Sequence, residues 1–357
     1  MRVVVTGATG NTGSSLVRLL ARDPEITEVV GFARRLPQLE LPGVTWVAGD
    51  VREHDLTALF RGAAAVVHLV WRIQPSRDTS DTYATDVAGT QRVLDAVAAA
   101  GVRTFVHASS IAAYGPGPSG PDETRVDETW PITGVRSNFY SREKVAAEEL
   151  VGRFEAEHPE VRVVRLRPAL VFKRTAAQEV RRYFLGPLWP SALVRPGRLP
   201  LAPTPVGLRF QVVHTDDLAE AYRLAVVRPD MRGAYNVATE PVITPRRLRA
   251  VLGGLPLPVP RRALRALAAV TWRTRAQPTP PSWVDLAYES PLMDASRLRA
   301  AGWTPRHDGP ATLRQLLEGL RDRAGDDAVP PLRTDAGGPL RADELRTGVG
   351  GRIDDRG

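Results

Sequence analysis

The chain has 357 residues, of which 43% are hydrophobic and 25% are charged, as is typical of a globular protein. It contains no cysteine, which excludes disulfides, thiolate catalysis and cysteine-ligated metal sites. Its net charge of +8 is compatible with nucleic-acid binding, but the basic residues are scattered and only two of the 48 are lysines, so we expect no nucleic-acid partner.

Two further kinds of signal are missing from the sequence. No apolar run is long enough to span a bilayer and the N-terminus shows no apolar signal core, so we expect a cytoplasmic protein without a membrane partner. None of the six histidines lies three or four residues from another, which leaves a histidine metal site without support.

Short apolar runs alternate with helical patterns from residue 2 to about residue 170. Strands that are apolar on both faces and separated by helices are typical of a parallel sheet covered on both sides. The sequence therefore predicts an α/β fold with a doubly wound parallel sheet. The runs predicted as strands are residues 3–5, 29–32, 44–47, 65–69, 103–108 and 161–166.

The pattern changes beyond Pro168. Residues 183–206 carry six prolines, which break any long helix. A strand-like run at 210–213, a helical pattern at 215–227 and a run at 234–237 that could rejoin the sheet come next. Residues 244–320 look helical, with proline breaks at 256–260 and 278–281.

These changes suggest how the domains divide. We expect a nucleotide-binding domain from residues 1–172 and about 208–240, and a smaller, interleaved substrate-binding cap from about 173–207 and 241–322. Glycine, proline and mixed charges dominate residues 323–357, which we expect to be a disordered tail.

A glycine-rich turn, T-G-x-x-G-x-x-G, links the first predicted strand to the first predicted helix. Glycines there permit a tight turn, the close approach of a pyrophosphate and close packing of the helix on the strand. The helix N-terminus adds free N–H groups and a positive dipole end. We expect a dinucleotide to bind at this turn, through Gly7, Thr9, Gly10, Asn11, Thr12 and Gly13.

The second and third predicted strands end where the adenosine of such a cofactor would lie. Arg34 and Arg35 follow the second strand, where an acid is typical of NAD(H) and arginine of a 2′-phosphate, so we favour NADP(H) over NAD(H). The competing interpretation is that Arg34 and Arg35 bind no phosphate and are simply solvated, as expected of many arginines in an arginine-rich chain. Asp50 and Val51 follow the third strand, where Asp50 can bind the adenine amino group or cap a helix.

Tyr140 and Lys144 lie four residues apart in a helical pattern, which places both side chains on one face. An ammonium one turn from a phenol stabilises the phenolate, and we expect it to move the Tyr140 pKa towards useful acid–base range. Ser110 follows the strand predicted at 103–108, at the sheet edge where ligands bind. Its hydroxyl can bind a substrate oxygen, although a serine in a strand-ending turn is a simpler explanation.

Together these motifs closely resemble the extended short-chain dehydrogenase/reductase family, in its NAD-dependent epimerase/dehydratase-like branch, over about residues 1–322. The resemblance implies a Rossmann-type domain and hydride transfer between a nicotinamide and a substrate alcohol or carbonyl. It implies Ser110, Tyr140 and Lys144 as the catalytic residues, with Tyr140 as acid/base. The residues that it implies to lie against the cofactor are Leu69, Ala108, Lys144 and Pro168.

Three departures from the family pattern stand out. Asp86 replaces the usual asparagine before the V-x-G-T run, and its role in the site is open. Lys173 stands where the family has glycine. It could contact the substrate, although a surface lysine is the simpler interpretation. The residues after Ser110 lack the Asp-Glu pair of sugar dehydratases, which argues against dehydration.

The sequence therefore predicts an NAD(P)-dependent oxidoreductase or epimerase that acts on a small-molecule alcohol or carbonyl. The apolar residues of 183–206 hint at a substrate other than a sugar, or simply at packing in the cap. A non-catalytic NAD(P)-binding sensor or scaffold is the alternative function, against which the intact Ser/Tyr/Lys set argues. A homodimer through helices near 82–100 and 138–157 is expected from the resemblance alone.

Overall fold

The computed structural model describes residues 1–74, 77–118, 123–186, 197 and 200–335. Its centre is a seven-stranded sheet in the order β11-β7-β5-β4-β1-β2-β3, with every neighbouring pair parallel. The six predicted strands are confirmed, and the run at 234–237 rejoins the sheet as its edge. The strands are β1 (Arg2–Thr6), β2 (Glu28–Ala33), β3 (Val44–Ala48), β4 (Ala65–His68), β5 (Thr104–Ala108), β7 (Arg162–Pro168) and β11 (Gly233–Val237).

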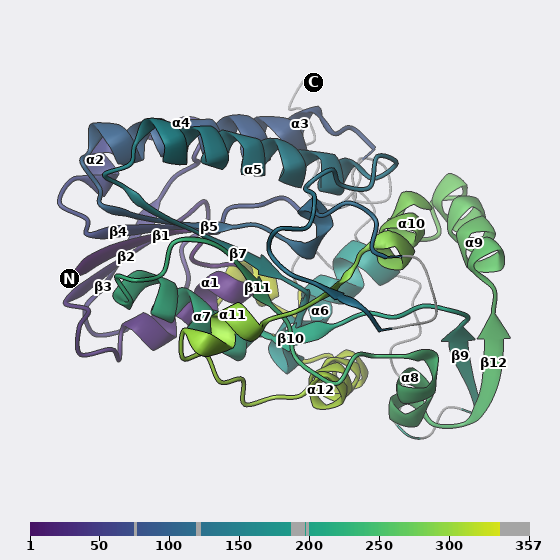
Figure 1. Cartoon of the computed structure of the whole chain (residues 1–357). Helices are drawn as coiled ribbons and strands as arrows, with labels where there is room; N and C mark the ends of the chain where they lie inside the picture. Colours follow the sequence, from purple (N-terminus) through teal and green to yellow (C-terminus); the bar gives the residue numbers. More distant parts are fainter. Residues whose placement is uncertain (75–76, 119–122, 187–196, 198–199, 336–357) are drawn as a thin grey trace, which may run out of the picture.

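Helices cover both faces of this sheet, as Figure 1 shows, so the predicted doubly wound α/β fold is confirmed. The alternation within β1 explains why: Val3 and Val5 belong to the core on one face, and Val4 belongs to the core on the other. One face is covered by α1 (Asn11–Leu20) and α7 (Thr215–Val227). The other is covered by α2 (Leu56–Phe60), α4 (Gly89–Ala99) and α5 (Phe139–Glu157).

Three two-stranded parallel ribbons and several short helices extend beyond the carboxyl ends of the sheet strands. The ribbons pair β6 (Arg125–Val126) with β13 (Leu292–Met293), β8 (Leu170–Phe172) with β10 (Val212–His214), and β9 (Leu201–Pro205) with β12 (Leu255–Val259). The helices are α3 (Ser80–Tyr83), α6 (Ala177–Val180), α8 (Pro245–Leu252), α9 (Arg261–Arg273), α10 (Ser282–Glu289) and α12 (Gly309–Asp322). Helix α11 (Ser296–Ala300) instead packs beside α7, where Leu298 joins the core on that face of the sheet.

Two expectations for this part of the chain are wrong. The prolines at 256–260 do not merely separate helices, because most of that segment is strand β12, whose parallel pairing with β9 overrides the local signal. The tail is ordered as far as residue 335, where Val329 and Leu332 are buried against Ala176. Residues 336–357 lie outside the described part of the chain. Within the described residues, no helix combines the length and apolarity needed to cross a membrane.

A buried ion pair fastens α5 to the sheet. Arg167, at the end of β7, donates from Nε and Nη2 to the two carboxylate oxygens of Glu148, at 2.8 and 3.1 Å. Both side chains are almost fully buried. Ser109, directly after β5, donates to the same carboxylate. The pair therefore joins α5 to the carboxyl ends of two neighbouring strands.

We expect Glu148→Gln to lower the free energy of unfolding by about 3 kcal/mol, because it leaves the buried Arg167 without its counter-charge. Burial raises the pKa of Glu148, but hydrogen bonds and the charge of Arg167 outweigh it and hold the pKa below its ordinary value. The stabilisation is therefore present above the pKa of the unfolded carboxyl and is lost as the pH falls through the lowered folded value.

Denaturant unfolding at several pH values measures this difference, which should shrink from neutral towards acidic pH. The exposed neighbour on the same helix, Glu149→Gln, is the matched control and should change stability little at any pH. Equal effects of the two substitutions would contradict the role given to the ion pair.

Candidate active site

The glycine turn between β1 and α1 forms a cradle of backbone groups. Gly7 adopts a φ of +73°, and a Cβ there would lie 2.8 Å from the backbone of Leu69. A Cβ on Gly13 would overlap the carbonyl oxygen of Gly7 and lie 2.8 Å from the Cα of Ala8. Gly10 caps α1 without a side chain and no acid lies in the first turn, so the first N–H groups of the helix remain available to an anion.

Lys173 lies against this turn and is not a surface residue, as the simpler interpretation of the sequence had it. Its side chain is buried, with the residue only 6% exposed. Its Nζ donates to the carbonyl of Asn11 at 3.0 Å and to the hydroxyls of Ser14 and Ser15, each at 3.1 Å. Burial lowers the pKa of Lys173 to about 8. The first turn of α1 thus has a buried amine beside it, which sequence analysis missed.

The residues expected near an adenosine lie at the ends of β2 and β3. Arg34 and Arg35 are exposed, and neither guanidinium forms a hydrogen bond or ion pair with another residue of the described chain. Both oxygens of Asp50 accept from the side chain of Arg52, at 3.1 and 2.8 Å, so this carboxylate is already engaged. Val51 is part of the core beneath α4. Contact of Asp50 and Val51 with an adenine stays a prediction.

Three residues that the resemblance placed against a cofactor end or follow neighbouring strands. Leu69 follows β4, Ala108 is the last residue of β5 and Pro168 is the last of β7. Because these strands are parallel, the three residues lie along one edge of the sheet, together with the glycine turn after β1.

The structure brings Ser110, Tyr140 and Lys144 together at this edge. Lys144 is 2% exposed, and its Nζ donates to the carbonyl of Ala108 at 2.7 Å. The same Nζ lies 3.2 Å from the ring centre of Trp71 and 5.7 Å from that of Tyr140. Ser110 lies close enough to the phenol of Tyr140 to affect its pKa, and its hydroxyl accepts the backbone N–H of Ala112 at 3.1 Å.

Ser141 explains why these groups meet. Its hydroxyl donates to the carbonyl of Ala112 and accepts the N–H of Val135, both at 2.6 Å. Asn138 caps α5 by accepting the N–H of Ser141 at 3.1 Å. The loop after Ser110 is therefore tied to the helix start that carries Tyr140.

The acid–base properties of the pair differ from the expectation. Burial raises the pKa of Tyr140 to about 12, and the charge of Asp86 acts in the same direction. The neighbouring hydroxyl of Ser110 lowers the pKa, but by less than burial raises it. Burial also lowers the pKa of Lys144 to about 7, although Asp86, Glu148 and Glu143 oppose this shift. The expected lowering of the Tyr140 pKa by the ammonium is wrong for this structure, because desolvation dominates. Tyr140 holds its proton at neutral pH.

Asp86, the residue that replaces the usual asparagine, is fully buried in a π-helical turn, Ala84–Ala88. One carboxylate oxygen accepts the N–H of Arg72 at 2.8 Å, and the other has no hydrogen-bond partner among the described residues. Burial raises its pKa well above the ordinary value. Its backbone carbonyl accepts from Thr90, so the residue joins the loop after β4 to α4.

Aromatic rings surround the phenol of Tyr140. Trp283 of α10 stacks on it with ring centres 5.4 Å apart, and Trp71 meets it edge-on at 6.1 Å. Phe184 packs edge-on against Trp283 at 5.0 Å. Phe184 belongs to the apolar segment noted in the sequence, whose Leu188, Trp189 and Leu193 lie outside the described residues. Nothing in the sequence pointed to Trp283, which is 143 positions away from Tyr140.

A second cluster, His214, Asp217 and His307, has the residue types of a metal site. Its donor atoms, however, already form hydrogen bonds. Nδ1 of His214 accepts the N–H of Asp216 at 3.2 Å, and the Asp217 carboxylate accepts the backbone N–H groups of Arg306 and His307 at 2.9 and 3.0 Å. These bonds fasten the segment before α12 to α7, which accounts for the cluster without an ion.

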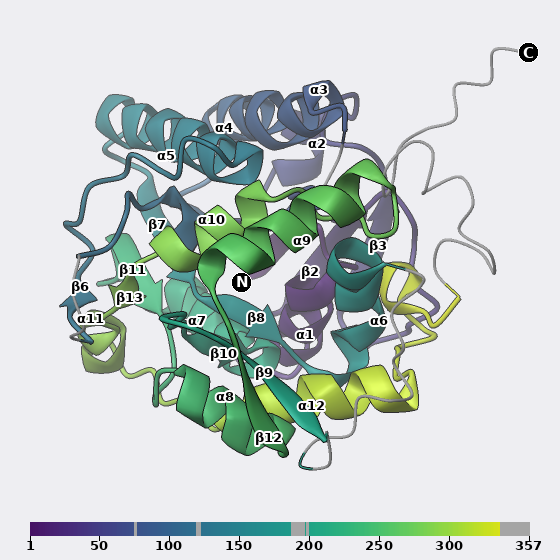
Figure 2. The ribbon, with the colours of Figure 1, turned by 90° about the vertical axis from the view of Figure 1, so that its right-hand side faces the viewer.

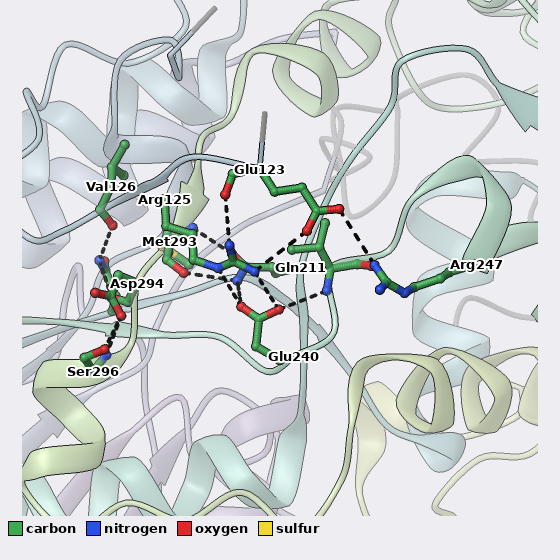
Figure 3. Close-up of polar contacts among 11 residues, drawn as sticks. Glu123, Arg125, Val126, Gln211, Glu240, Arg247, Met293, Asp294 and Ser296 are labelled. Carbon is green, nitrogen blue, oxygen red and sulfur yellow. Dashed lines mark hydrogen bonds and ion pairs between the residues drawn. The ribbon is translucent and has the colours of Figure 1, made fainter. Parts of the chain in front are cut away.

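A polar cleft of about 360 Å³ lies beside the β6–β13 ribbon and is also accounted for by internal pairing. Figure 3 shows Arg125 directed at Glu240, to which it donates at 2.8 and 3.0 Å. Gln211 donates to Glu240 and exchanges hydrogen bonds with the backbone of Met293. These contacts fasten the ribbon to the end of β11 and carry no reactive group.

We expect Gly13→Ala to abolish dinucleotide binding, since the added methyl would overlap the Gly7 carbonyl and push α1 away from the turn. Fluorescence titration with NADPH and NADH measures the binding. Gly152→Ala on α5 is the matched control, because a Cβ there meets only the side chain of Arg165 at 3.8 Å. Retained affinity in Gly13→Ala would show that the cradle is not the binding site.

Comparisons with known proteins agree with this geometry. The sequence profile of the NAD dependent epimerase/dehydratase family matches residues 3–238, more than half of the chain. The chain is 29% identical over 286 residues to 2-alkyl-3-oxoalkanoate reductase of Shewanella oneidensis, across 74% of this chain and 69% of that protein. It is 33% identical over 158 residues to 3 beta-hydroxysteroid dehydrogenase type 7 of Mus musculus, and this match spans 42% of this chain but only 43% of the mouse protein.

Solved structures share the fold. A short-chain dehydrogenase/reductase superfamily protein from Agrobacterium tumefaciens with bound NAD superimposes with a TM-score of 0.67 at 23% identity, across 90% of this chain and 98% of the other. UDP-glucose 4-epimerase of Thermus thermophilus in complex with NAD superimposes with a TM-score of 0.62 at 24% identity. This match covers 90% of this chain and 99% of the epimerase. The profile match, together with the glycine cradle and the Ser/Tyr/Lys set, shows that the chain belongs to the NAD-dependent epimerase/dehydratase family.

Proposed function

We propose that the protein is an NAD(P)H-dependent oxidoreductase that reduces a carbonyl group on an apolar small molecule. The observation that carries this proposal is the phenol of Tyr140, which is protonated, lies beside Ser110 and is surrounded by aromatic rings at the carboxyl edge of the sheet. Such a group can donate a proton to an oxygen that gains negative charge.

The residues present fit a nicotinamide dinucleotide, because Gly7 and Gly13 leave a cradle that any Cβ would fill. The turn from Gly7 to Gly13 would hold its pyrophosphate, and Lys144 would reach its ribose hydroxyls. When bound, the cofactor supplies or accepts a hydride. Arg34 and Arg35 favour NADP(H), since two guanidiniums that form no ion pair with the described residues suit a 2′-phosphate.

The reaction that we propose uses each catalytic residue in a distinct role. Ser110 donates a hydrogen bond to the substrate carbonyl and fixes its oxygen beside Tyr140. Tyr140 donates its proton to that oxygen as the carbonyl carbon gains a hydride, so that a carbonyl becomes an alcohol. Lys144, with a pKa of about 7, is the nearby ammonium that stabilises the phenolate formed. The reverse sequence would oxidise an alcohol.

An apolar substrate is supported by the walls of the site. Trp71 and Trp283 present ring faces and edges to Tyr140, and Leu286 and Phe139 complete the same cluster. Sugar hydroxyls would find few partners among such side chains. The relatives named for 2-alkyl-3-oxoalkanoates and for hydroxysteroids fit this chemistry. On this view residues 173–207 and 241–322 serve as the substrate-binding cap.

Tyr140→Phe should lower kcat by about 10²- to 10⁴-fold while nicotinamide binding is retained, because only the proton donor is removed. The assay follows oxidation of NADPH and NADH with a 3-oxosteroid or a 2-alkyl-3-oxoalkanoate as substrate. UDP-glucose is tested separately, for epimerisation and for reduction of NAD⁺ and NADP⁺. Tyr83→Phe, at an exposed tyrosine on α3, is the control and should be as active as the unmodified protein. Turnover of UDP-glucose alone would contradict the apolar substrate, and an active Tyr140→Phe would contradict the mechanism.

For cofactor choice, we expect NADPH to bind at least about tenfold more tightly than NADH, which corresponds to roughly 1.4 kcal/mol. Replacing both Arg34 and Arg35 by alanine should remove this difference by weakening NADPH alone. Tryptophan fluorescence titration gives both Kd values, and Arg22→Ala, another exposed arginine, is the control. If NADH binds the unmodified protein as tightly as NADPH, the two arginines are merely solvated.

A further inference from the structure

Exposed apolar side chains gather on one part of the molecule. Nine large hydrophobic side chains are exposed in the described residues, and six of them lie on β9, β12, α9 or the turn after β9. Apolar area that gathers in one place on a surface marks an interaction site more often than scattered exposure does. The six are Leu201, Val206, Leu255, Leu257, Leu267 and Val270.

The β9–β12 ribbon turns an apolar face outward. Leu201 is paired with Leu255 and Pro203 with Leu257, so these four side chains share one face of the ribbon. Leu255 is 67% exposed, whereas Ala202 on the opposite face is fully buried. Packing among the described residues does not account for this ribbon face.

Helix α9 continues the same surface. It begins directly after β12 and contains no buried residue. Ala263, Leu267 and Val270 form a stripe at helical spacing, and the last two are 60% and 58% exposed. Figure 1 places α9 and the ribbon at the outer edge of the cap, and in Figure 2 both face the viewer. We call α9 and the outer face of the ribbon the cap face.

The cap face is basic. Helix α9 carries four arginines and no acidic residue. Two of them, Arg261 and Arg265, pair with Asp285 of α10. Arg262 and Arg273 are exposed on α9, beside the apolar stripe. An apolar stripe with arginines at its borders is the pattern of a helix that lies in a membrane interface.

We propose that the cap face docks on an anionic lipid surface, with Leu255, Leu267 and Val270 entering the interface and the arginines facing phosphate headgroups. Charge complementarity favours this partner over a second copy, because a symmetric contact would bring two such positive faces together. Leu, Val and Ala between the arginines neither stack on bases nor bind their edges, which favours lipid over nucleic acid. The proposal adds a peripheral membrane contact to a chain expected to have none.

The cap face lies next to the aromatic wall of the site. Arg261 and Arg265 of α9 both donate to Asp285 of α10, at 3.1 Å. The same short helix carries Trp283, which stacks on Tyr140. Only one helix, α10, would therefore separate a lipid surface from the site that an apolar substrate must reach. This route for the substrate rests on the proposed function.

Co-sedimentation of the full chain with lipid vesicles tests the docking itself, with no substrate present. We expect binding to phosphatidylcholine vesicles that contain about 30% phosphatidylglycerol, weak binding to phosphatidylcholine alone, and weakening by salt. The double substitution Leu267→Glu/Val270→Glu should abolish binding, and Arg262→Ala/Arg273→Ala should lower it about tenfold. Leu36→Glu and Arg153→Ala, exposed elsewhere, are the matched controls and should bind as the unmodified protein does.

Circular dichroism and thermal melting establish that each variant is folded. Sedimentation that is absent, or unaffected by Leu267→Glu/Val270→Glu, would overturn the proposal. A dimer that this double substitution dissociates would assign the cap face to a second copy, and tighter binding to single-stranded RNA than to vesicles would assign it to nucleic acid. Vesicle binding is measured without turnover, so a failed search for a carbonyl substrate would not affect the docking proposal. A failure to bind vesicles would likewise leave the proposed carbonyl reduction untouched.

Discussion

Glu148 and Arg167 meet where their side chains are almost fully buried, and each charge offsets the cost of burying the other. Their geometry determines where α5 lies against β7, and the bond from Ser109 adds the end of β5. Lys144 lies one helical turn before Glu148, so its side chain is directed at the same edge of the sheet. The position of Lys144 at this edge of the sheet therefore depends on a contact outside the Ser/Tyr/Lys set.

Burial decides the protonation of the site as well as its shape. The aromatic rings and the packed helix start remove water from Tyr140 and Lys144, which raises the pKa of the phenol and lowers that of the amine. A phenol that keeps its proton is ready to donate it, whereas a phenolate would be ready to accept one. Under the proposed function this state suits carbonyl reduction, and the same rings that set it would form an apolar wall for the substrate.

The segments beyond the central sheet contribute on two sides. On the inner side, Lys173 binds the first turn of α1 and Trp283 stacks on Tyr140, so these segments contact both the glycine turn and the phenol. On the outer side, β12 and α9 present leucines, valine and arginines to the surroundings. Helix α10 separates the two sides, which makes the outer surface and the site near neighbours.

Short-range patterns were sufficient for the main sheet, for the glycine turn and for the shared face of Tyr140 and Lys144, because strand alternation, turn sterics and helical periodicity each act over a few residues. Long-range packing decided the rest. Lys173 reaches Ser14 across 159 positions, and desolvation reversed the expected shift of the Tyr140 pKa. An amphipathic helix such as α9 has one sequence pattern whether its apolar face meets a core or the surroundings, so only the tertiary structure could show that no described residue buries this face.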